Sequence, residues 1–285
     1  MHTAHTATGE RSIGAILVDS GKLTIDQAER ILRTQKDEKL RFGDAAVKLG
    51  LLRPEDIQFA LARQYDYPYL IKGGGEIADE LIAAYQPFSP QVEALRALRS
   101  QLMLRWFTGE AGRKSLAVAS PGRGEGRSWL VANLAVVFSQ LGERTLVIDA
   151  DLRNPRQHAL FKLENRSGLS HILSNRGEVN AVQRIGSFRD LSVLPAGPIP
   201  PNPQELLGRS LFARFLEEVG HEFDVVIIDT PAAAECADAH GVAVNSGGAL
   251  LLARKHETSF TDLAALSDDL RGVGVRVVGS VLTEF

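Results

Sequence analysis

The chain has 285 residues, of which 44% are hydrophobic and 24% charged, and its formal net charge is −3. This balance is typical of a globular protein, excludes a disordered chain and gives no indication of a nucleic-acid partner. A single cysteine, Cys236, excludes an internal disulfide and a cysteine-based zinc site, as is typical of proteins of the reducing cytoplasm.

The sequence shows no targeting or membrane-spanning segment. Residues 1–10 are polar, lack the apolar stretch of a signal peptide and are expected to form a disordered tail. The apolar runs are of strand length, far below the roughly 18 residues that indicate a membrane span. We therefore expect a cytoplasmic protein, with any membrane contact coming through a partner.

Residues 11–72 contain a duplication with a constant spacing. The matching pairs are Gly14 and Gly43, Gly21 and Gly50, Leu23 and Leu52, Leu32 and Leu61, and Gln35 and Gln64. Each copy predicts a short helix that ends at a glycine, followed by a second helix with acidic residues in its first turn. We therefore predict a small helical tandem-repeat domain over residues 11–72.

The role of this repeat has two interpretations. The pattern alone indicates a helical module that packs and docks. In the second copy Arg41, Phe42 and Gly43 follow one another, whereas Ser12 stands at the place of the arginine in the first copy. The repeat resembles the N-terminal domain of type II secretion and pilus-assembly ATPases, some of which bind cyclic di-GMP through tandem motifs that begin Arg-Leu-Gly. The resemblance implies that this domain binds cyclic di-GMP.

The tyrosines of the chain follow the repeat directly. They are Tyr65, Tyr67, Tyr69 and Tyr85. Pro68 disfavours a helix at the residue before it, so the tyrosine-rich stretch is expected to be extended. A glycine-rich stretch comes next, and we predict a linker over residues 73–88.

From residue 89 onward the pattern predicts an α/β domain. Apolar runs of strand length alternate with helical segments, which is typical of a mostly parallel sheet wrapped by helices. The predicted strands cover residues 115–119, 145–149, 191–195, 225–229, 249–253 and 275–282.

A glycine-rich turn, residues 120–128, separates the first predicted strand from a helix predicted over residues 128–141. Glycines let the backbone approach a phosphate, and a helix N-terminus offers unpaired N–H groups to it. The turn departs from the common P-loop pattern, because Arg127 replaces the lysine and Pro121 the first glycine. We predict a P-loop NTPase fold for residues 89–285. The predicted phosphate-binding residues are Gly122, Arg123, Gly124, Glu125, Gly126, Arg127, Ser128 and Trp129.

Acidic residues follow two of the predicted strands. Asp149 ends the second strand and is followed by Asp151, and Asp229 ends the fourth strand. The carboxyl ends of parallel strands border the ligand crevice of an open sheet. Carboxylate oxygens suit the magnesium ion that phosphoryl transfer requires. The sequence therefore predicts that these three aspartates gather around a magnesium ion beside the glycine-rich turn.

Three further motifs carry a family resemblance. Residues 149–153 read Asp-Ala-Asp-Leu-Arg, and residues 200–207 read Pro-Pro-Asn-Pro-Gln-Glu-Leu-Leu. Glu93, Arg96 and Arg99 lie on one face of a predicted helix. Together with the glycine-rich turn, these motifs resemble those of the bacterial tyrosine kinases of polysaccharide export. They also occur in the same order as in that family. The N-terminal repeat makes the chain similar to the EpsG type, the chain-length-determinant tyrosine kinases of exopolysaccharide clusters.

The resemblance implies roles for the motif residues. ATP phosphates would be held by Gly124, Gly126, Arg127 and Ser128, and magnesium by Ser128, Asp149 and Asp229. Asp149 and Asp151 would bracket the metal and the incoming tyrosine hydroxyl, one of them as the base, with Arg127 also in the catalytic set. Glu93, Arg96 and Arg99 would support a ring of protomers.

The resemblance also implies a partner and targets. The family works with a separately encoded, membrane-embedded chain-length regulator of polysaccharide export. Many members carry a C-terminal tyrosine cluster, whereas no tyrosine follows Tyr85 in this sequence. The expected targets are therefore the residues from Tyr65 to Tyr85 or tyrosines on a partner.

Other functions compete with the kinase. A non-catalytic, nucleotide-gated adaptor of the export machinery is favoured by Arg127 and by the absence of tyrosines after Tyr85. A partitioning or septum-positioning ATPase would carry a lysine where Gly122 stands. A dinucleotide-binding dehydrogenase would need a third glycine after Gly122 and Gly124, and none stands at the required spacing.

Overall fold

The computed structural model describes residues 12–64, 68–70, 73–108, 113–175 and 181–284. The chain divides into two compact units, Met1–Pro68 and Tyr69–Phe285. The expected tail over residues 1–10, and also Tyr65 and Tyr67, lie outside the described residues. Among the described helices none combines the length and the apolarity that a bilayer span requires.

The N-terminal unit is built from the predicted pairs of helices. They are α1 (Ile13–Asp19), α2 (Ile25–Glu38), α3 (Phe42–Lys48) and α4 (Pro54–Gln64). In each copy the chain turns after the short helix through a glycine with a positive φ, 71° at Gly21 and 65° at Gly50. A side chain is strained in this conformation, so the repeated glycines set the repeated turn.

The second helix of each copy begins in the same way. Gln27 accepts a hydrogen bond from the backbone N–H of Thr24 through Oε1 at 2.9 Å, and Asp56 accepts one from the backbone N–H of Arg53 through Oδ2 at 3.0 Å. Both acceptors stand three residues after the N-cap position, where they pair an N–H group that the helix leaves unbonded. The duplication is therefore preserved in structure as well as in sequence.

Within the described residues of the second unit, seven strands form one sheet in the order β3-β4-β2-β5-β1-β6-β7. The strands are β1 (Ser115–Ala119), β2 (Thr145–Asp149), β3 (Gln183–Arg184), β4 (Leu191–Leu194), β5 (Val225–Asp229), β6 (Gly248–Arg254) and β7 (Arg276–Thr283). The pairing is parallel except between β3 and β4. The predicted strands and the mostly parallel sheet are confirmed, and the added β3 is a two-residue edge strand without an apolar run.

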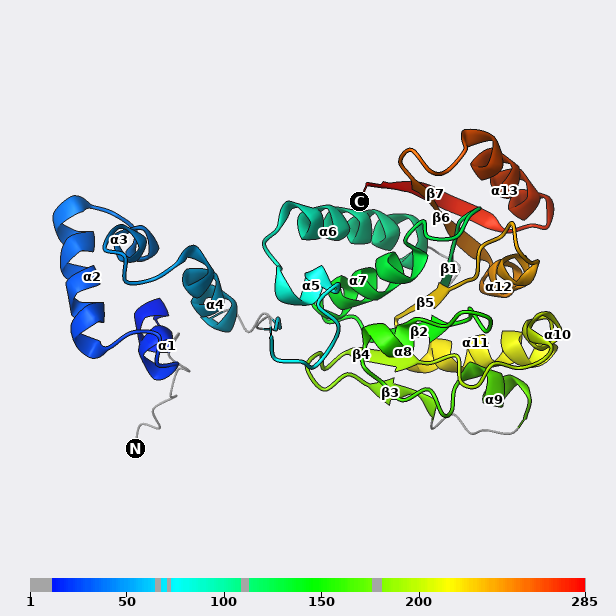
Figure 1. Ribbon diagram of the computed structural model, residues 1–285, viewed down its shortest axis with the longest axis horizontal. Coiled ribbons are helices and arrows are strands. Elements are labelled where there is room, and N and C mark those ends of the chain that lie inside the picture. Colours follow the sequence, from blue (N-terminus) through cyan, green and yellow to red (C-terminus); the bar gives the residue numbers. More distant parts are fainter. Residues whose placement is uncertain (1–11, 65–67, 71–72, 109–112, 176–180, 285) are drawn as a thin grey trace, which may run out of the picture. The chain divides into compact units, whose positions relative to one another are not determined.

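Helices cover both faces of this sheet (Figure 1). On one face lie α5 (Ile82–Tyr85), α6 (Pro90–Leu102), the π-helical turn Met103–Phe107, α7 (Arg127–Ser139) and α8 (Gln157–Leu160). On the other face lie α9 (Leu169–Leu173), α10 (Pro203–Leu207), α11 (Ser210–Glu222), α12 (Asp238–Ser246) and α13 (Phe260–Gly272). Alternate residues of the central strands point to opposite faces, so each layer of helices buries its own apolar core.

The stretch 73–88, expected to be a linker, packs into the core of the second unit. Ile77 and Leu81 are buried, and the backbone N–H of Ala83 donates to Asn133 Oδ1 on α7 at 2.9 Å. Tyr85 is buried as well, and its hydroxyl donates to the carbonyl oxygen of Ile77 at 2.8 Å. The difference from the expectation has a physical reason, because the apolar residues after the glycines can be buried only against a neighbouring core.

Candidate active site

The glycine-rich turn joins the end of β1 to the start of α7. Gly124 and Gly126 have φ values of 70° and 100°, a region that other residues enter only with strain. Gly126 is the N-cap residue of α7, so the first N–H groups of this helix face the end of the turn. This arrangement offers backbone donors and a positive helix end to an anion.

Side chains from distant parts of the chain hold the turn in shape. Glu125 is buried, and its carboxylate accepts hydrogen bonds from the backbone N–H of Gly122 at 2.8 Å and from the hydroxyl of Thr258. The hydroxyl of Thr283, at the end of β7, lies 3.2 Å from the carbonyl oxygen of Glu125. Glu125 therefore stabilises the turn from within rather than facing the cavity beside it.

Arg127 is tied into the protein by its guanidinium. Its Nε donates to the carbonyl oxygen of Thr230 at 2.9 Å, and its Nη1 donates to the carbonyl oxygen of Gly122 at 2.6 Å and to the hydroxyl of Ser120. Thr230 directly follows β5. The single ammonium of a lysine lacks the fork that spans these acceptors. The arginine thus links the glycine-rich turn to the end of β5.

Asp149, at the end of β2, is completely buried. Its Oδ1 accepts the backbone N–H of Asp151 at 3.2 Å, and its Oδ2 accepts those of Arg156 at 3.0 Å and Gln157 at 2.9 Å. Burial raises the pKa of Asp149 well above its ordinary value, and the negative charge of Asp229 adds to the rise. The side chain organises the loop after β2.

Asp151 lies closer to solvent and lines a cavity beside the glycine-rich turn. Its Oδ1 accepts the backbone N–H groups of Arg153 at 3.1 Å and Asn154 at 2.8 Å. Both bonds are accepted by the same oxygen, and together they fix the direction of the carboxylate.

Asp229 ends β5 next to Asp149 and is also completely buried. Burial raises its pKa, and hydrogen bonds from Ser128 and Gln157 oppose that rise. The Nε2 of Gln157 donates to Asp229 Oδ2 at 2.8 Å. The other oxygen, Oδ1, is buried and has no hydrogen-bond partner among the described residues.

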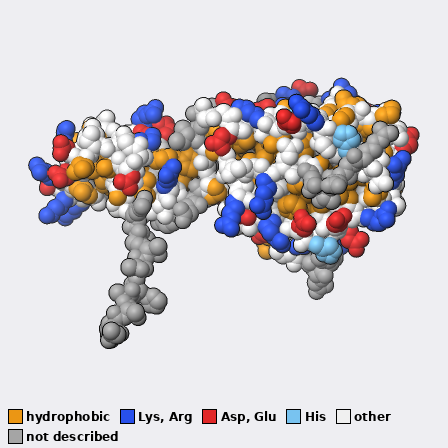
Figure 2. All heavy atoms as spheres, turned by 90° about the horizontal axis from the view of Figure 1, so that it is seen from below, with side chains coloured by type: hydrophobic (Ala, Val, Ile, Leu, Met, Phe, Trp, Pro, Cys, Tyr) orange, Lys and Arg blue, Asp and Glu red, His pale blue; other side chains and the backbone are white. Residues whose placement is uncertain are grey.

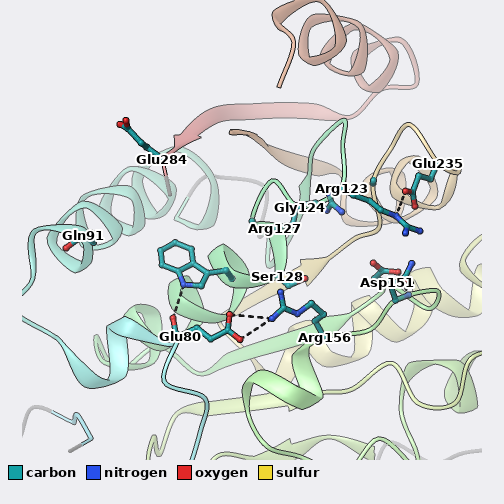
Figure 3. A pocket seen from close by; sticks show the side chains of 14 residues that line it. Glu80, Gln91, Arg123, Gly124, Arg127, Ser128, Asp151, Arg156, Glu235 and Glu284 are labelled. Carbon is teal, nitrogen blue, oxygen red and sulfur yellow. Dashed lines mark hydrogen bonds and ion pairs between the residues drawn. The ribbon is translucent and has the colours of Figure 1, made fainter. Parts of the chain in front are cut away.

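A cavity of about 620 Å³ opens beside the turn and the carboxyl ends of the strands (Figure 3). Its lining residues are Glu80, Gln91, Arg123, Gly124, Gly126, Arg127, Ser128, Trp129, Asp151, Asn154, Arg156, Ala232, Glu235 and Glu284. The volume is in the range of cavities that hold a small ligand or cofactor.

Two ion pairs border this cavity (Figure 3). Arg156 Nη2 lies 3.1 Å from Glu80 Oε1, and Arg123 pairs with Glu235. The carbonyl oxygen of Glu80 also accepts a hydrogen bond from Trp129 Nε1 at 2.8 Å. The stretch 73–88 thus contacts both α7 and the loop after β2.

The cavity brings together part of the predicted set of residues. Arg123, Gly124, Gly126, Arg127, Ser128, Trp129 and Asp151 line it. Gly122, Glu125, Asp149 and Asp229 are not among its lining residues. Glu80, Asn154, Arg156 and Glu235 also line the cavity and were not predicted from the sequence. Of these, Asn154 and Arg156 had a usable signal, because they directly follow the acidic motif at residues 149–153.

The charged residues expected to support oligomers lie on α6, outside the lining of the cavity. Arg96 Nη1 contacts Glu93 Oε2 at 3.0 Å. Arg99 turns inward, and its Nη1 donates to the carbonyl oxygen of Val137 in the last turns of α7 at 2.7 Å. Arg99 therefore stabilises the C-terminal end of α7 in a single chain.

The parallel sheet, the glycine-rich turn heading α7 and the aspartates at adjacent strand ends define a P-loop NTPase fold. In fold the chain is similar to the cell division ATPase MinD of Pyrococcus furiosus, with a TM-score of 0.53 and 23% identity over 60% of this chain and 71% of that chain. Residues 113–246 match the family model described as an AAA domain.

Two further similarities are more specific. The chain is 33% identical to the tyrosine-protein kinase YwqD of Bacillus subtilis over 209 residues, 73% of this chain and 87% of that protein. It is also similar to the kinase domain of the Escherichia coli tyrosine kinase ETK, with a TM-score of 0.68 and 33% identity over 72% of this chain and 79% of that chain. The chain belongs to the bacterial tyrosine-protein kinase family.

Proposed function

We propose that the protein is an ATP-dependent protein-tyrosine kinase that regulates the chain length and export of an exopolysaccharide. One observation carries the proposal. The glycine-rich turn, with its helix N-terminus, and the Asp151 carboxylate face the same cavity, which is large enough for a nucleotide. The similarity to tyrosine-protein kinases adds the reaction type.

The residues present suit a magnesium–nucleotide complex. The backbone N–H groups at the start of α7 face the place proposed for the phosphates, and Arg123 and Arg127 line the same cavity. The Ser128 hydroxyl lines the cavity, and Asp229 Oδ1 is a buried acceptor without a partner among the described residues. Oxygen donors of this kind suit magnesium, which neutralises charge on phosphate groups during their transfer.

We assign Asp151 as the base that accepts the proton of the incoming tyrosine hydroxyl. It lines the cavity, whereas Asp149 is completely buried and bonded to three backbone N–H groups. A proton acceptor must reach the proton that it takes, which favours Asp151 over Asp149. In this proposal Asp149 holds the loop that carries Asp151.

The targets and partners are part of the same proposal. Tyr85 is excluded as a target of the folded chain, because it is buried and its hydroxyl is bonded to Ile77. Tyr65, Tyr67, Tyr69 or tyrosines on a partner remain as targets. The family resemblance supports a membrane-embedded chain-length regulator as that partner, a cytoplasmic location at its inner face, and a ring of protomers whose contacts include Glu93 and Arg96 on α6.

A non-catalytic, nucleotide-gated adaptor is a second candidate function. The observation that favours it is the guanidinium of Arg127, which bonds to Thr230, Gly122 and Ser120 rather than standing free as a P-loop lysine would. The adaptor would bind the same nucleotide and release its partner without transferring a phosphoryl group.

A transfer assay separates the two candidates. The full chain is incubated with radiolabelled ATP, magnesium and a tyrosine-bearing cytoplasmic peptide of the chain-length regulator. The kinase predicts label on tyrosine, of the peptide or of the chain, that disappears in Asp151→Asn. Nucleotide binding without any transfer of label would leave the adaptor, and the absence of nucleotide binding would remove both.

Cyclic di-GMP is not part of this proposed function. A groove of about 610 Å³ lies in the N-terminal unit and is lined mostly by apolar residues, and Figure 2 shows hydrophobic side chains at the surface of this unit. The charged residues of its lining, Asp19 and Glu29, are both acidic and would repel a phosphate. Ser12 is occupied as the N-cap of α1, where its hydroxyl accepts the backbone N–H of Ala15 at 3.3 Å.

A further inference from the structure

Gln157 connects three parts of the candidate site. It is the first residue of α8 and is completely buried. Its backbone N–H donates to Asp149 Oδ2 at 2.9 Å. Its Nε2 donates to Asp229 Oδ2 at 2.8 Å and to the carbonyl oxygen of Ser128 at 3.1 Å. One side chain thus bonds to the end of β5 and to the first turn of α7, while its backbone bonds to the end of β2.

These bonds decide which oxygen of Asp229 remains available. The amide nitrogen of Gln157 uses both of its hydrogens, one of them on Asp229 Oδ2. Asp229 Oδ1 is then left buried and, among the described residues, without a partner. A buried carboxylate oxygen without a donor is costly in free energy. A magnesium ion bound at this oxygen would offset that cost.

The chemical type of residue 157 matters for this role. A lysine or arginine at this position would neutralise Asp229 and compete with a metal ion. An apolar residue would remove the hydrogen bond that holds Oδ2 of the carboxylate. A neutral amide orients the carboxylate and keeps its charge for the metal.

We propose that Gln157 is a positioning residue, which fixes Asp229 and the Ser128 end of α7 in the geometry that receives the magnesium ion of a bound nucleotide. The inference rests on the proposed nucleotide binding and assigns a function to a residue outside the sequence motifs. It concerns binding of the metal–nucleotide complex and is independent of whether phosphoryl transfer follows.

Calorimetry with ADP tests this role in the full chain. The affinity is measured with EDTA and again with magnesium, and the ratio of the two is the magnesium-dependent gain. Gln157→Met has a similar length but donates no hydrogen bond. We expect its gain to fall by about tenfold, the effect of losing one charge-assisted hydrogen bond, while its affinity in EDTA stays within about twofold of wild type.

Two further variants make the test specific. Gln140→Met is the matched control, because Gln140 Nε2 donates to the carbonyl oxygen of Ala83 at 3.1 Å, away from the cavity, and its gain should equal that of wild type. In an Asp229→Asn background, the effect of Gln157→Met on the gain should be smaller than in wild type, because the bond to Asp229 carries part of the role of Gln157.

The outcomes separate the inference from the proposed function. An unchanged gain in Gln157→Met, or an equal effect in the Asp229→Asn background, overturns the positioning role and leaves nucleotide binding intact. No ADP binding by wild type overturns both. If Gln157→Met does not fold, Gln157→Asn replaces it, since this shorter amide reaches only one of the two acceptors; an unchanged gain there overturns the role as well.

Discussion

Asp149 stands directly opposite Asp229 in the register of the parallel strands β2 and β5, and both carboxylates are completely buried. The two side chains nevertheless differ in their partners. Both oxygens of Asp149 are bonded to backbone N–H groups, whereas one oxygen of Asp229 is left without a partner among the described residues. Neighbouring aspartates at one sheet edge are thus suited to different tasks, one to shaping a loop and the other to receiving a cation.

Asp149→Ala is expected to weaken the fold. The substitution leaves the buried or half-buried N–H groups of Asp151, Arg156 and Gln157 without their acceptor. Each unsatisfied group of this kind costs about 1 kcal/mol or more, so the free energy of unfolding should fall by roughly 3 kcal/mol. Urea denaturation without nucleotide measures the change. A loss below about 1 kcal/mol would show that the loop after β2 does not depend on this carboxylate.

Asp151→Asn is expected to remove activity and leave stability nearly unchanged. Asparagine keeps the Oδ1 acceptor that bonds to the N–H groups of Arg153 and Asn154, so the turn survives. It lacks the basic oxygen, and loss of general-base catalysis lowers the rate by about 10² to 10⁴. Initial rates of tyrosine phosphorylation and urea denaturation are compared with wild type. Activity within tenfold of wild type contradicts the assignment of Asp151.

The strand pattern made much of the fold predictable. Buried central strands are continuous apolar runs, so β1, β2 and β5 coincide with the predicted ranges. The glycine-rich turn and Asp151 were predictable because their positions follow directly from those strand ends. The short strand β3 carries no such run and was not predicted.

What the sequence did not reveal depends on contacts between distant residues. Thr258 and Thr283 support Glu125 from more than 100 residues away, and no local pattern marks them. The stretch 73–88 begins with glycines, which favoured a linker, yet its later apolar residues pack on α7 and place Glu80 at the cavity. The direction of the Arg127 side chain also depends on tertiary contacts, since its acceptor Thr230 follows a different strand.

Arg127→Lys, which restores the common P-loop residue, is expected to destabilise this protein. The lysine cannot keep the bonds to both Thr230 and Gly122. Losing one or two hydrogen bonds from a charged donor should lower the free energy of unfolding by about 1.5 to 3 kcal/mol. Urea denaturation without nucleotide measures this. Equal or higher stability of the lysine variant would mean that the arginine does not link the turn to β5 in solution.

Glu80→Gln is expected to strengthen nucleotide binding at low salt. The substitution removes the negative charge that pairs with Arg156 and leaves this guanidinium for a phosphate in the cavity. Both side chains are about half exposed, so stability should change by less than about 1 kcal/mol. The ATP affinity should rise about two- to threefold at low ionic strength and approach that of wild type in high salt. Calorimetry at two salt concentrations gives the result, and a weaker affinity at low salt would argue that Glu80 supports the site.

Asp224→Asn is expected to make stability less dependent on acid pH. Asp224 precedes β5 and bonds to the guanidinium of Arg144, which precedes β2, with Nε to Oδ2 at 2.9 Å and Nη2 to Oδ1 at 2.7 Å. The Arg144 hydrogen bonds hold the pKa of Asp224 below its ordinary value of 3.8, against the effect of burial.

A carboxyl whose pKa is lowered by folding adds stability above its unfolded pKa and loses it as the pH falls through the folded pKa. The wild type should therefore be the more stable protein at about pH 7, and its advantage should shrink below about pH 4, where the carboxyl becomes protonated in both states. Urea denaturation of both proteins between about pH 7 and pH 3 follows this difference in the free energy of unfolding. If the advantage of the wild type stays constant or grows on acidification, the ion pair does not link the starts of β2 and β5.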